Sequence, residues 1–170
     1  MTTLNVVEIT RRFRFEAMHW LPDHPKCGWP HGHSYILEVT VAGPINESGM
    51  VVDFGELKNM MAPILKDLDH GCLNVWLSGG FVHRYEGVTG VGFDIRAGDA
   101  LAAATPPTAE NLIVALRREI LRGMSMAETA AGNNPFLRVE LVQLTLWETV
   151  DSWCTWRADA KYSRQEHSQG

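Results

Sequence analysis

The chain has few cysteines and no long apolar segment. Its 170 residues include three cysteines, Cys27, Cys72 and Cys154. These are too few and too scattered for a disulfide framework, and we expect Cys72 and Cys154 to be packing residues. No apolar run approaches the length that spans a bilayer, and the first residues lack the charged and apolar parts of a signal peptide. We therefore expect a protein of the reducing cytoplasm with no membrane partner.

An excess of positive charge is also absent. The net charge is −5 at pH 7, whereas general nucleic-acid binding needs a basic surface, so we expect no nucleic acid among the partners. The hydrophobic fraction of 45% and the charged fraction of 21% are typical of a globular protein. A chain of this length can bury a core, and we predict a single domain over residues 1–170.

Three histidines carry the most specific signal in the sequence. His19 ends one stretch of alternating apolar residues, and His31 and His33 begin another. Because side chains alternate between the two faces of a strand, a hairpin of these stretches would bring the three imidazoles together. Three neutral imidazoles are the ligand set of a catalytic zinc site with an open fourth position, so we predict that they bind zinc. The alternative is that all three are ordinary strand or loop residues.

Two further residues are candidates for chemistry near such a site. Cys27 lies between His19 and His31 in the sequence, and a nearby metal favours the thiolate, the form of cysteine that acts as a base or nucleophile. Glu148 ends an apolar strand face that we expect to contain Val142, Leu144 and Leu146. A carboxylate in that position is costly unless it is paired, so it indicates a site.

The hydrophobic pattern predicts an α+β protein. We expect strands at 5–19, 32–42, 136–148 and 152–158, a helix capped by Asp53 that ends near Leu68, and a helix capped by Thr108 that ends near Arg122. The order β-β-α-α-β-β is typical of an antiparallel sheet with two helices on one face.

Several details of this pattern are less regular. Pro63 should kink the first helix or end it early, and Gly123 should stop the second helix. We interpret the glycine-rich residues 75–106 as an insertion, with a hairpin or lid whose short strands are 81–85 and 91–95. The polar residues 159–170 should form a frayed tail.

A series of motifs resembles the 6-pyruvoyl-tetrahydropterin synthase family, in the same order along the chain. The matching segments are FEAMH at 15–19, Cys27 with HGHSY at 31–35, VDFGELK at 52–58, LDHGCLN at 68–74, PTAENL at 107–112, and Glu148. Three residues separate Cys27 from His31. This spacing is similar to that of the 6-carboxy-5,6,7,8-tetrahydropterin synthases of the queuosine and 7-deazaguanine pathway, whereas the 6-pyruvoyl enzymes usually have a longer spacer.

The resemblance implies a fold, an assembly and a reaction. The family has the tunnelling fold, and its members form homo-oligomers, typically hexamers built as dimers of trimers, with active sites between subunits. The implied substrate is 7,8-dihydroneopterin triphosphate, and the implied products are 6-carboxy-5,6,7,8-tetrahydropterin, acetaldehyde and triphosphate.

The resemblance also implies roles for individual residues. Zinc on the three histidines would act as a Lewis acid, Cys27 would abstract a proton, and Asp69 and His70 would relay protons. Glu148 would hold the amino-pyrimidine edge of the pterin and would also belong to the catalytic proton relay. Thr108 and Glu110 would contact the substrate. Two of these assignments have simpler alternatives. Asp69 and His70 can be a helix C-terminal pair, and Glu110 can simply favour the dipole at a helix N-terminus.

Two other functions remain open at this point. A 6-pyruvoyl-tetrahydropterin synthase would share the metal and the fold but eliminate only triphosphate. A non-catalytic oligomeric module that binds zinc or pterin would not need Cys27, Asp69, His70 and Glu148, so their presence favours an enzyme. A plain zinc hydrolase would leave the thiol without a role.

Overall fold

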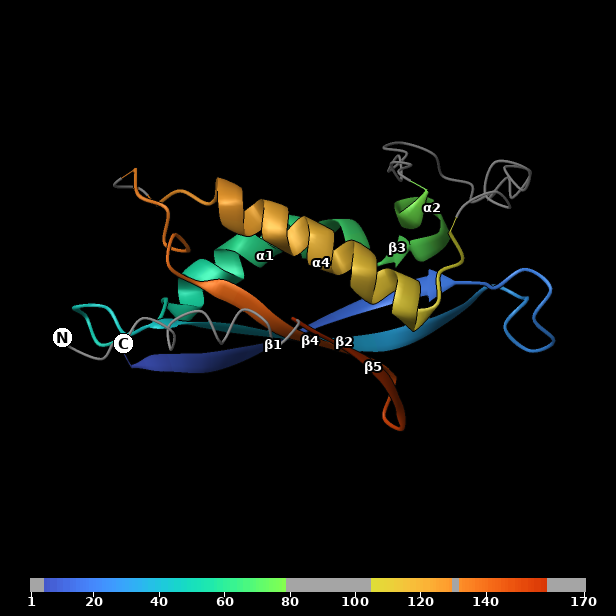
Figure 1. The fold of residues 1–170 in the computed structure, drawn as a ribbon. Coiled ribbons are helices and arrows are strands. Elements are labelled where there is room, and N and C mark those ends of the chain that lie inside the picture. The colour runs from blue at the N-terminus through green and yellow to red at the C-terminus, as the bar shows by residue number, and fades with distance from the viewer. Residues whose placement is uncertain (1–4, 79–104, 130–131, 159–170) are drawn as a thin grey trace.

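A computed structural model describes residues 5–78, 105–129 and 132–158, which form one five-stranded sheet covered on one face by helices (Figure 1). The order of strands in the sheet is β3-β1-β2-β4-β5. The elements are β1 Val6–His19, β2 His31–Pro44, α1 Phe54–Leu68, β3 Gly71–Cys72, α2 Leu73–Leu77, α4 Ala109–Met126, β4 Glu140–Thr149 and β5 Ser152–Arg157.

The hairpin of β1 and β2 is the longest pairing in the sheet, and it confirms the predicted alternation. The two strands pair antiparallel from Val6 opposite Pro44 to His19 opposite His31. The side chains that face the helices are buried, and they are Phe13, Phe15, Ala17 and His19 on β1 and Tyr35, Leu37, Val39 and Val41 on β2. The predicted antiparallel sheet needs one correction, because the two-residue strand β3 pairs parallel to β1.

Helix α1 begins as predicted and continues past its proline. The side chain of Asp53 accepts a hydrogen bond from the backbone N–H of Gly55, which caps the helix. Of the two expected effects of Pro63, a kink or an early end, the early end is wrong, since the helix continues to Leu68. Its buried residues, Leu57, Met60, Met61, Ile64 and Leu68, all belong to the core.

Helix α4 also begins as predicted, but it does not stop at Gly123. Thr108 caps it, and the helix continues to Met126. A side chain at position 123 would place its Cβ only 2.8 Å from Sδ of Met60. Gly123 therefore lets α1 and α4 approach closely, and this packing outweighs the poor helix propensity of glycine.

Strand β4 starts later than predicted, whereas β5 starts at Ser152 as expected, and the pairing of β4 shifts register against both of its neighbours. Residues 135–138 form a turn and Val139 lies outside the strand, so β4 begins only at Glu140. The pairing of β2 with β4 shifts between Thr40 and Val41, which leaves Val142 as a bulge. As a result Leu141, rather than Val142, joins Leu144 and Leu146 in the core.

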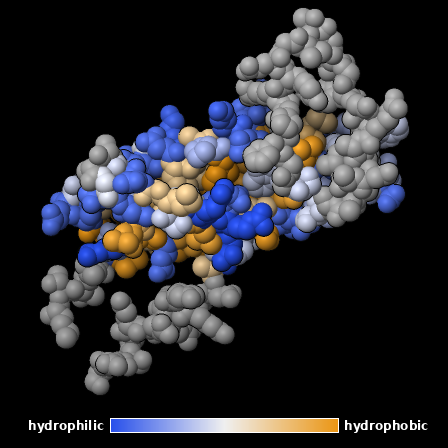
Figure 2. Space-filling model, turned by 90° about the horizontal axis from the view of Figure 1, so that it is seen from above, coloured by the Kyte–Doolittle hydropathy of each residue, from blue (hydrophilic) through white to orange (hydrophobic). Residues whose placement is uncertain are grey.

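Some of the predicted features lie outside the described residues. The short strands expected at 81–85 and 91–95 and the tail at 159–170 belong to this group, while residues 75–77 of the expected insertion belong to α2. In the described part of the chain, no helix is long and apolar enough to cross a membrane. The outer surface of the helix layer mixes hydrophilic and hydrophobic residues (Figure 2), and Val114, Leu121 and Met126 of α4 are among its exposed apolar side chains.

Candidate active site

The three predicted histidines meet where β1 ends and β2 begins. One ring nitrogen of each of His19, His31 and His33 lies within 4.8 Å of the other two, and their ring centroids are 4.6 to 5.1 Å apart. The antiparallel register, with His19 directly opposite His31, produces this arrangement. The cluster could hold a metal ion.

His19 is the most constrained of the three. It is 1% exposed, and its Nδ1 lies 2.8 Å from the carbonyl oxygen of Pro107, just before α4. A carbonyl can only accept, so Nδ1–H donates and Nε2 keeps its lone pair. Nε2 is buried and has no hydrogen-bond partner among the described residues. A buried lone pair without a partner is costly, and a metal ion would satisfy it.

Burial also keeps the cluster in the form that binds metals. It lowers the pKa of His19 below its ordinary value, against the opposing effects of the Pro107 carbonyl and Glu148. It lowers the pKa of His33 for the same reason. Both imidazoles are therefore neutral near pH 7, as metal binding requires.

The loop between the two strands holds His31 and contains Cys27. Nδ1 of His31 donates to the carbonyl of Trp29 at 2.8 Å, which again directs Nε2 away from the backbone. Cys27 is half-buried in this loop. Its backbone N–H donates to Nδ1 of His24 at 2.9 Å, and its carbonyl accepts from Leu21 at 2.7 Å. The loop is thus closed on itself next to the cluster.

Glu148, at the end of β4, faces the histidine cluster. Its Oε1 lies 3.4 Å from Nε2 of His19 and 3.7 Å from Nε2 of His33, and the hydroxyl of Tyr35 donates to the same oxygen at 3.4 Å. Burial, followed by the nearby Glu148, raises the pKa of Tyr35, so Tyr35 stays a hydrogen-bond donor. A carboxylate beside these imidazole nitrogens adds negative charge next to their lone pairs. The combination favours the binding of a cation.

Asp69 and His70 lie away from the cluster within one chain. Asp69 accepts a hydrogen bond from the backbone N–H of Glu16 at 2.9 Å, and the backbone N–H of His70 donates to the Glu16 carbonyl at 2.6 Å. The hydrogen bond from Glu16 lowers the pKa of Asp69. Nδ1 of His70 is 3.1 Å from Oδ2 of Asp69, and the His70 side chain is 76% exposed. Glu16 precedes His19 by three strand positions, or about 10 Å.

The remaining candidates, Thr108 and Glu110, lie at the start of α4. Oγ1 of Thr108 accepts from the backbone N–H of Asn111 at 3.3 Å, so its structural role as a cap is confirmed. Glu110 is exposed in the first turn. Cys154 of β5 packs against the same turn, where its Sγ donates to the carbonyl of Ala109 at 3.2 Å. Burial raises the pKa of Cys154 to about 11, which fits the predicted packing role.

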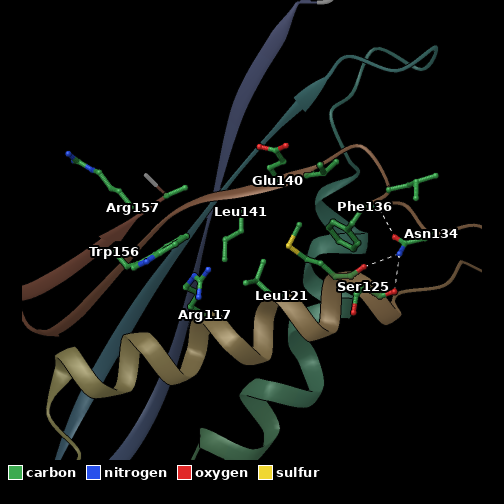
Figure 3. Close-up of a pocket in the computed structure, with 13 residues that line it drawn as sticks. Arg117, Leu121, Ser125, Asn134, Phe136, Glu140, Leu141, Trp156 and Arg157 are labelled. Atoms are coloured by element: carbon green, nitrogen blue, oxygen red, sulfur yellow. Dashed lines mark hydrogen bonds between the residues drawn. The ribbon is translucent and has the colours of Figure 1, made fainter. Parts of the chain in front are cut away.

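A separate cavity of about 870 Å³ lies at the other end of α4 (Figure 3). It is lined by residues of α4, β4, β5 and the segment before β4, among them Arg117, Phe136 and Trp156. The guanidinium of Arg117 lies over the Trp156 ring, 4.7 Å from its centroid. None of the predicted site residues lines this cavity.

Sequence reasoning singled out the three histidines and Glu148, which the structure brings together, but not the groups that support them. It did not predict the hydrogen bonds that support the site, which come from the carbonyls of Pro107 and Trp29, the hydroxyl of Tyr35 and the ring of His24. Backbone acceptors have no signature in a sequence. Tyr35 could have been found, since it follows His31 and His33 at the same two-residue period.

Comparison with known proteins agrees with this geometry. Residues 8–159 match the 6-pyruvoyl tetrahydropterin synthase family. The chain belongs to this family. The 6-carboxy-5,6,7,8-tetrahydropterin synthase of Rickettsia bellii is 35% identical over 123 residues, which cover 68% of this chain and 80% of that protein. The Synechocystis protein with the same name is 45% identical over 73 residues, covering 39% of this chain and 57% of its own length.

A third relative and two solved structures complete the comparison. The putative 6-carboxy-5,6,7,8-tetrahydropterin synthase of Archaeoglobus fulgidus is 43% identical over 60 residues, which are 35% of this chain and 52% of that protein. The structure of the Caenorhabditis elegans 6-pyruvoyl tetrahydropterin synthase has a TM-score of 0.64 at 23% identity, over 93% of this chain and 99% of that chain. The Plasmodium vivax enzyme has a TM-score of 0.61 at 17% identity, over 91% and 98%. These likenesses confirm the predicted tunnelling fold.

Proposed function

We propose that this chain is a zinc-dependent lyase. It would convert 7,8-dihydroneopterin triphosphate to 6-carboxy-5,6,7,8-tetrahydropterin, acetaldehyde and triphosphate in the queuosine and 7-deazaguanine pathway, in the cytoplasm. The observation that carries the proposal is the cluster of His19, His31 and His33, with a buried, unpartnered Nε2 on His19 and the Glu148 carboxylate beside it. The names of the curated relatives support the choice of reaction.

The donor set fits zinc. Two of the imidazoles donate Nδ1–H to backbone carbonyls, an arrangement that fixes the tautomer of a metal-ligating histidine. Three histidines with an open position are typical of catalytic zinc. When bound, zinc would supply Lewis-acid polarisation of the substrate's side-chain oxygens, which acidifies protons on the adjacent carbons.

Protein groups around the cluster would handle protons and orientation. Cys27, in the loop next to His31, would abstract a proton as the thiolate. Glu148 would accept hydrogen bonds from the amino-pyrimidine edge of the pterin, in place of its contact with the Tyr35 hydroxyl. Thr108 and Glu110 would contact substrate from the start of α4, where the side chain of Glu110 is exposed.

Asp69 and His70 would act from a neighbouring subunit. The backbone of His70 is hydrogen-bonded to Glu16 rather than placed beside the cluster, and its imidazole is exposed. An exposed imidazole could reach the substrate bound to another subunit, as a proton relay requires. We therefore propose a homo-oligomer, a hexamer built as a dimer of trimers by family resemblance, with sites between subunits. Light scattering tests it, and a fully active monomer would contradict it.

A product assay tests the reaction itself. The zinc-loaded protein is incubated with 7,8-dihydroneopterin triphosphate, and the products are identified by mass spectrometry. We expect 6-carboxy-tetrahydropterin together with acetaldehyde. Formation of the 6-pyruvoyl product without acetaldehyde would favour the alternative synthase, which has the same family membership. Binding of pterin without turnover would favour the non-catalytic module.

A further inference from the structure

The first turn of α4 is connected to the candidate metal centre through one backbone atom. The carbonyl oxygen of Pro107 accepts from Nδ1 of His19 at 2.8 Å, across 88 residues of sequence. Both residues are buried, so water does not compete for this hydrogen bond and the low local dielectric strengthens it. The position of this carbonyl therefore sets the orientation of the His19 ring.

A side-chain amide braces the turn that carries this carbonyl. Nδ2 of Asn111 donates to the carbonyl of Pro106 at 2.9 Å, and the backbone N–H of Thr108 donates to the same oxygen at 2.9 Å. The hydroxyl of Thr108 in turn accepts from the backbone N–H of Asn111 at 3.3 Å. Residues 106–111 thus form a closed set of hydrogen bonds around Pro107, whose φ is already fixed by its ring.

The residue type at position 111 fits this role better than it fits the helix. Asn111 is the third residue of α4, where Glu or Gln commonly completes a capping box and where asparagine is a poorer helix former. A carboxylate could not donate to the Pro106 carbonyl, because an ionised carboxylate only accepts. The need for a donor accounts for an amide at this position.

We propose that Asn111 is a positioning residue of the metal centre. Its amide holds the 106–108 turn so that the Pro107 carbonyl keeps His19 in the Nδ1–H tautomer, with Nε2 free to bind metal. The tautomer of a histidine is set by the hydrogen bond that its other nitrogen makes, and loss of such outer partners weakens metal binding. The inference rests on the proposed function in that the cluster binds zinc.

The test compares three variants of the full chain. Asn111→Ala removes the amide, and Asn111→Asp keeps its shape but cannot donate. Asn134→Ala is the matched control, because Nδ2 of Asn134 likewise donates to backbone carbonyls, those of Met124 and Ser125 near the other end of α4 (Figure 3). Zinc affinity is measured by competition with a chromophoric chelator. The tautomer of His19 is read from ¹⁵N NMR shifts of the metal-free protein.

We expect both Asn111 variants to bind zinc about ten-fold more weakly, at the low end of the roughly 10–100-fold cost of losing an outer-shell partner. They should also show a shift of His19 toward the Nε2–H tautomer. The control should keep wild-type affinity and tautomer, even where its melting temperature falls. A merely structural role for Asn111 would lower stability without changing the tautomer.

The outcomes separate this inference from the proposed function. If the wild-type protein itself binds no zinc at the histidines, the metal centre fails regardless of the variants. If the wild-type protein binds zinc and the folded Asn111 variants match it in affinity and tautomer, the positioning role is overturned while the metal centre stands. Should Asn111→Ala fail to fold, Asn111→Asp decides the question, since a carboxylate suits the first turn of a helix.

Discussion

Replacing Glu148 with glutamine should weaken zinc binding by at least about 30-fold. The substitution keeps the shape of the side chain and removes one negative charge. Oε1 of Glu148 lies 3.4 Å from Nε2 of His19 and 3.7 Å from Nε2 of His33. A cation held by these nitrogens would therefore lie next to the carboxylate. Its binding free energy must include the attraction between the cation and the carboxylate.

The size of the effect follows from the separation and the solvent exposure. Two unit charges about 4 Å apart attract by about 1 kcal/mol in bulk water and by about 4 kcal/mol at an effective dielectric constant of about 20. The Glu148 side chain is 26% exposed, so its environment lies between these limits. For a divalent ion even the smaller value doubles to about 2 kcal/mol, which corresponds to roughly a 30-fold change in Kd.

The assay is a competition titration of the metal-free protein with a chromophoric zinc chelator, at pH 7.5 and moderate salt. Glu140→Gln serves as the matched control, because Glu140 is an exposed carboxylate at the opposite end of the same strand. The control removes the same net charge from the chain. It should leave the affinity unchanged, which separates the local contact from a general change in charge.

The pH dependence gives a second readout with a definite sign. Glu148 raises the pKa of His19 and of His33 against the effect of burial, so removing it lowers both pKa values further. Protons then compete less with the metal in the variant, and the difference in affinity should narrow as the pH falls below 7. Equal zinc affinity of Glu148→Gln and wild-type protein at neutral pH would refute the argument.

Three further predictions concern the base, the helix packing and acid stability. Cys27→Ala should keep its zinc and lose about 10²–10⁴-fold in turnover, and near-normal turnover of the zinc-loaded variant would exclude the proposed base. Gly123→Val should destabilise the protein by about 1–3 kcal/mol in urea unfolding, since a Cβ there meets Met60 Sδ at 2.8 Å, and adding Met60→Ala should recover part of the loss. The folded-state pKa values of His19 and His33 lie below the ordinary 6.5, so the unfolded chain binds protons first. The metal-free protein should therefore lose stability as the pH falls below about 6.5, and a flat profile between pH 7 and 5 would contradict the burial of these rings.

The part of the site built on the β1–β2 hairpin was predictable from sequence. A period of two along each strand places His19 on the core face of one strand and His31 and His33 on that of the other. The structure pairs the two strands antiparallel with His19 opposite His31, although the connecting residues 20–30 form a loop too long to set this register by turn geometry alone. Binary patterning is a strong signal here because a slip of one residue would turn every apolar side chain to the other face.

The parts that sequence could not predict depend on distant contacts. Gly123 stops a helix in isolation, and it is the approach of Met60 from another helix that keeps it inside α4. The bulge at Val142, where the pairing with β2 shifts register, changes which apolar residue of β4 is buried. Strand β3 has two residues and α2 has five. Both are too short for the strand period of two or the helix period of 3.6 to show in the sequence.

The position of His70 connects this local geometry to assembly. Its backbone is tied to the edge of β1 at Glu16, its φ is +59°, and its imidazole is 76% exposed. A left-handed backbone conformation in a non-glycine residue is uncommon and costs about 1–3 kcal/mol, so the hydrogen bonds of Asp69 and His70 to Glu16 must hold it there. The ring of His70 is therefore exposed at the surface of the chain. An exposed ring held in this way fits the proposal that His70 completes the site of a neighbouring subunit.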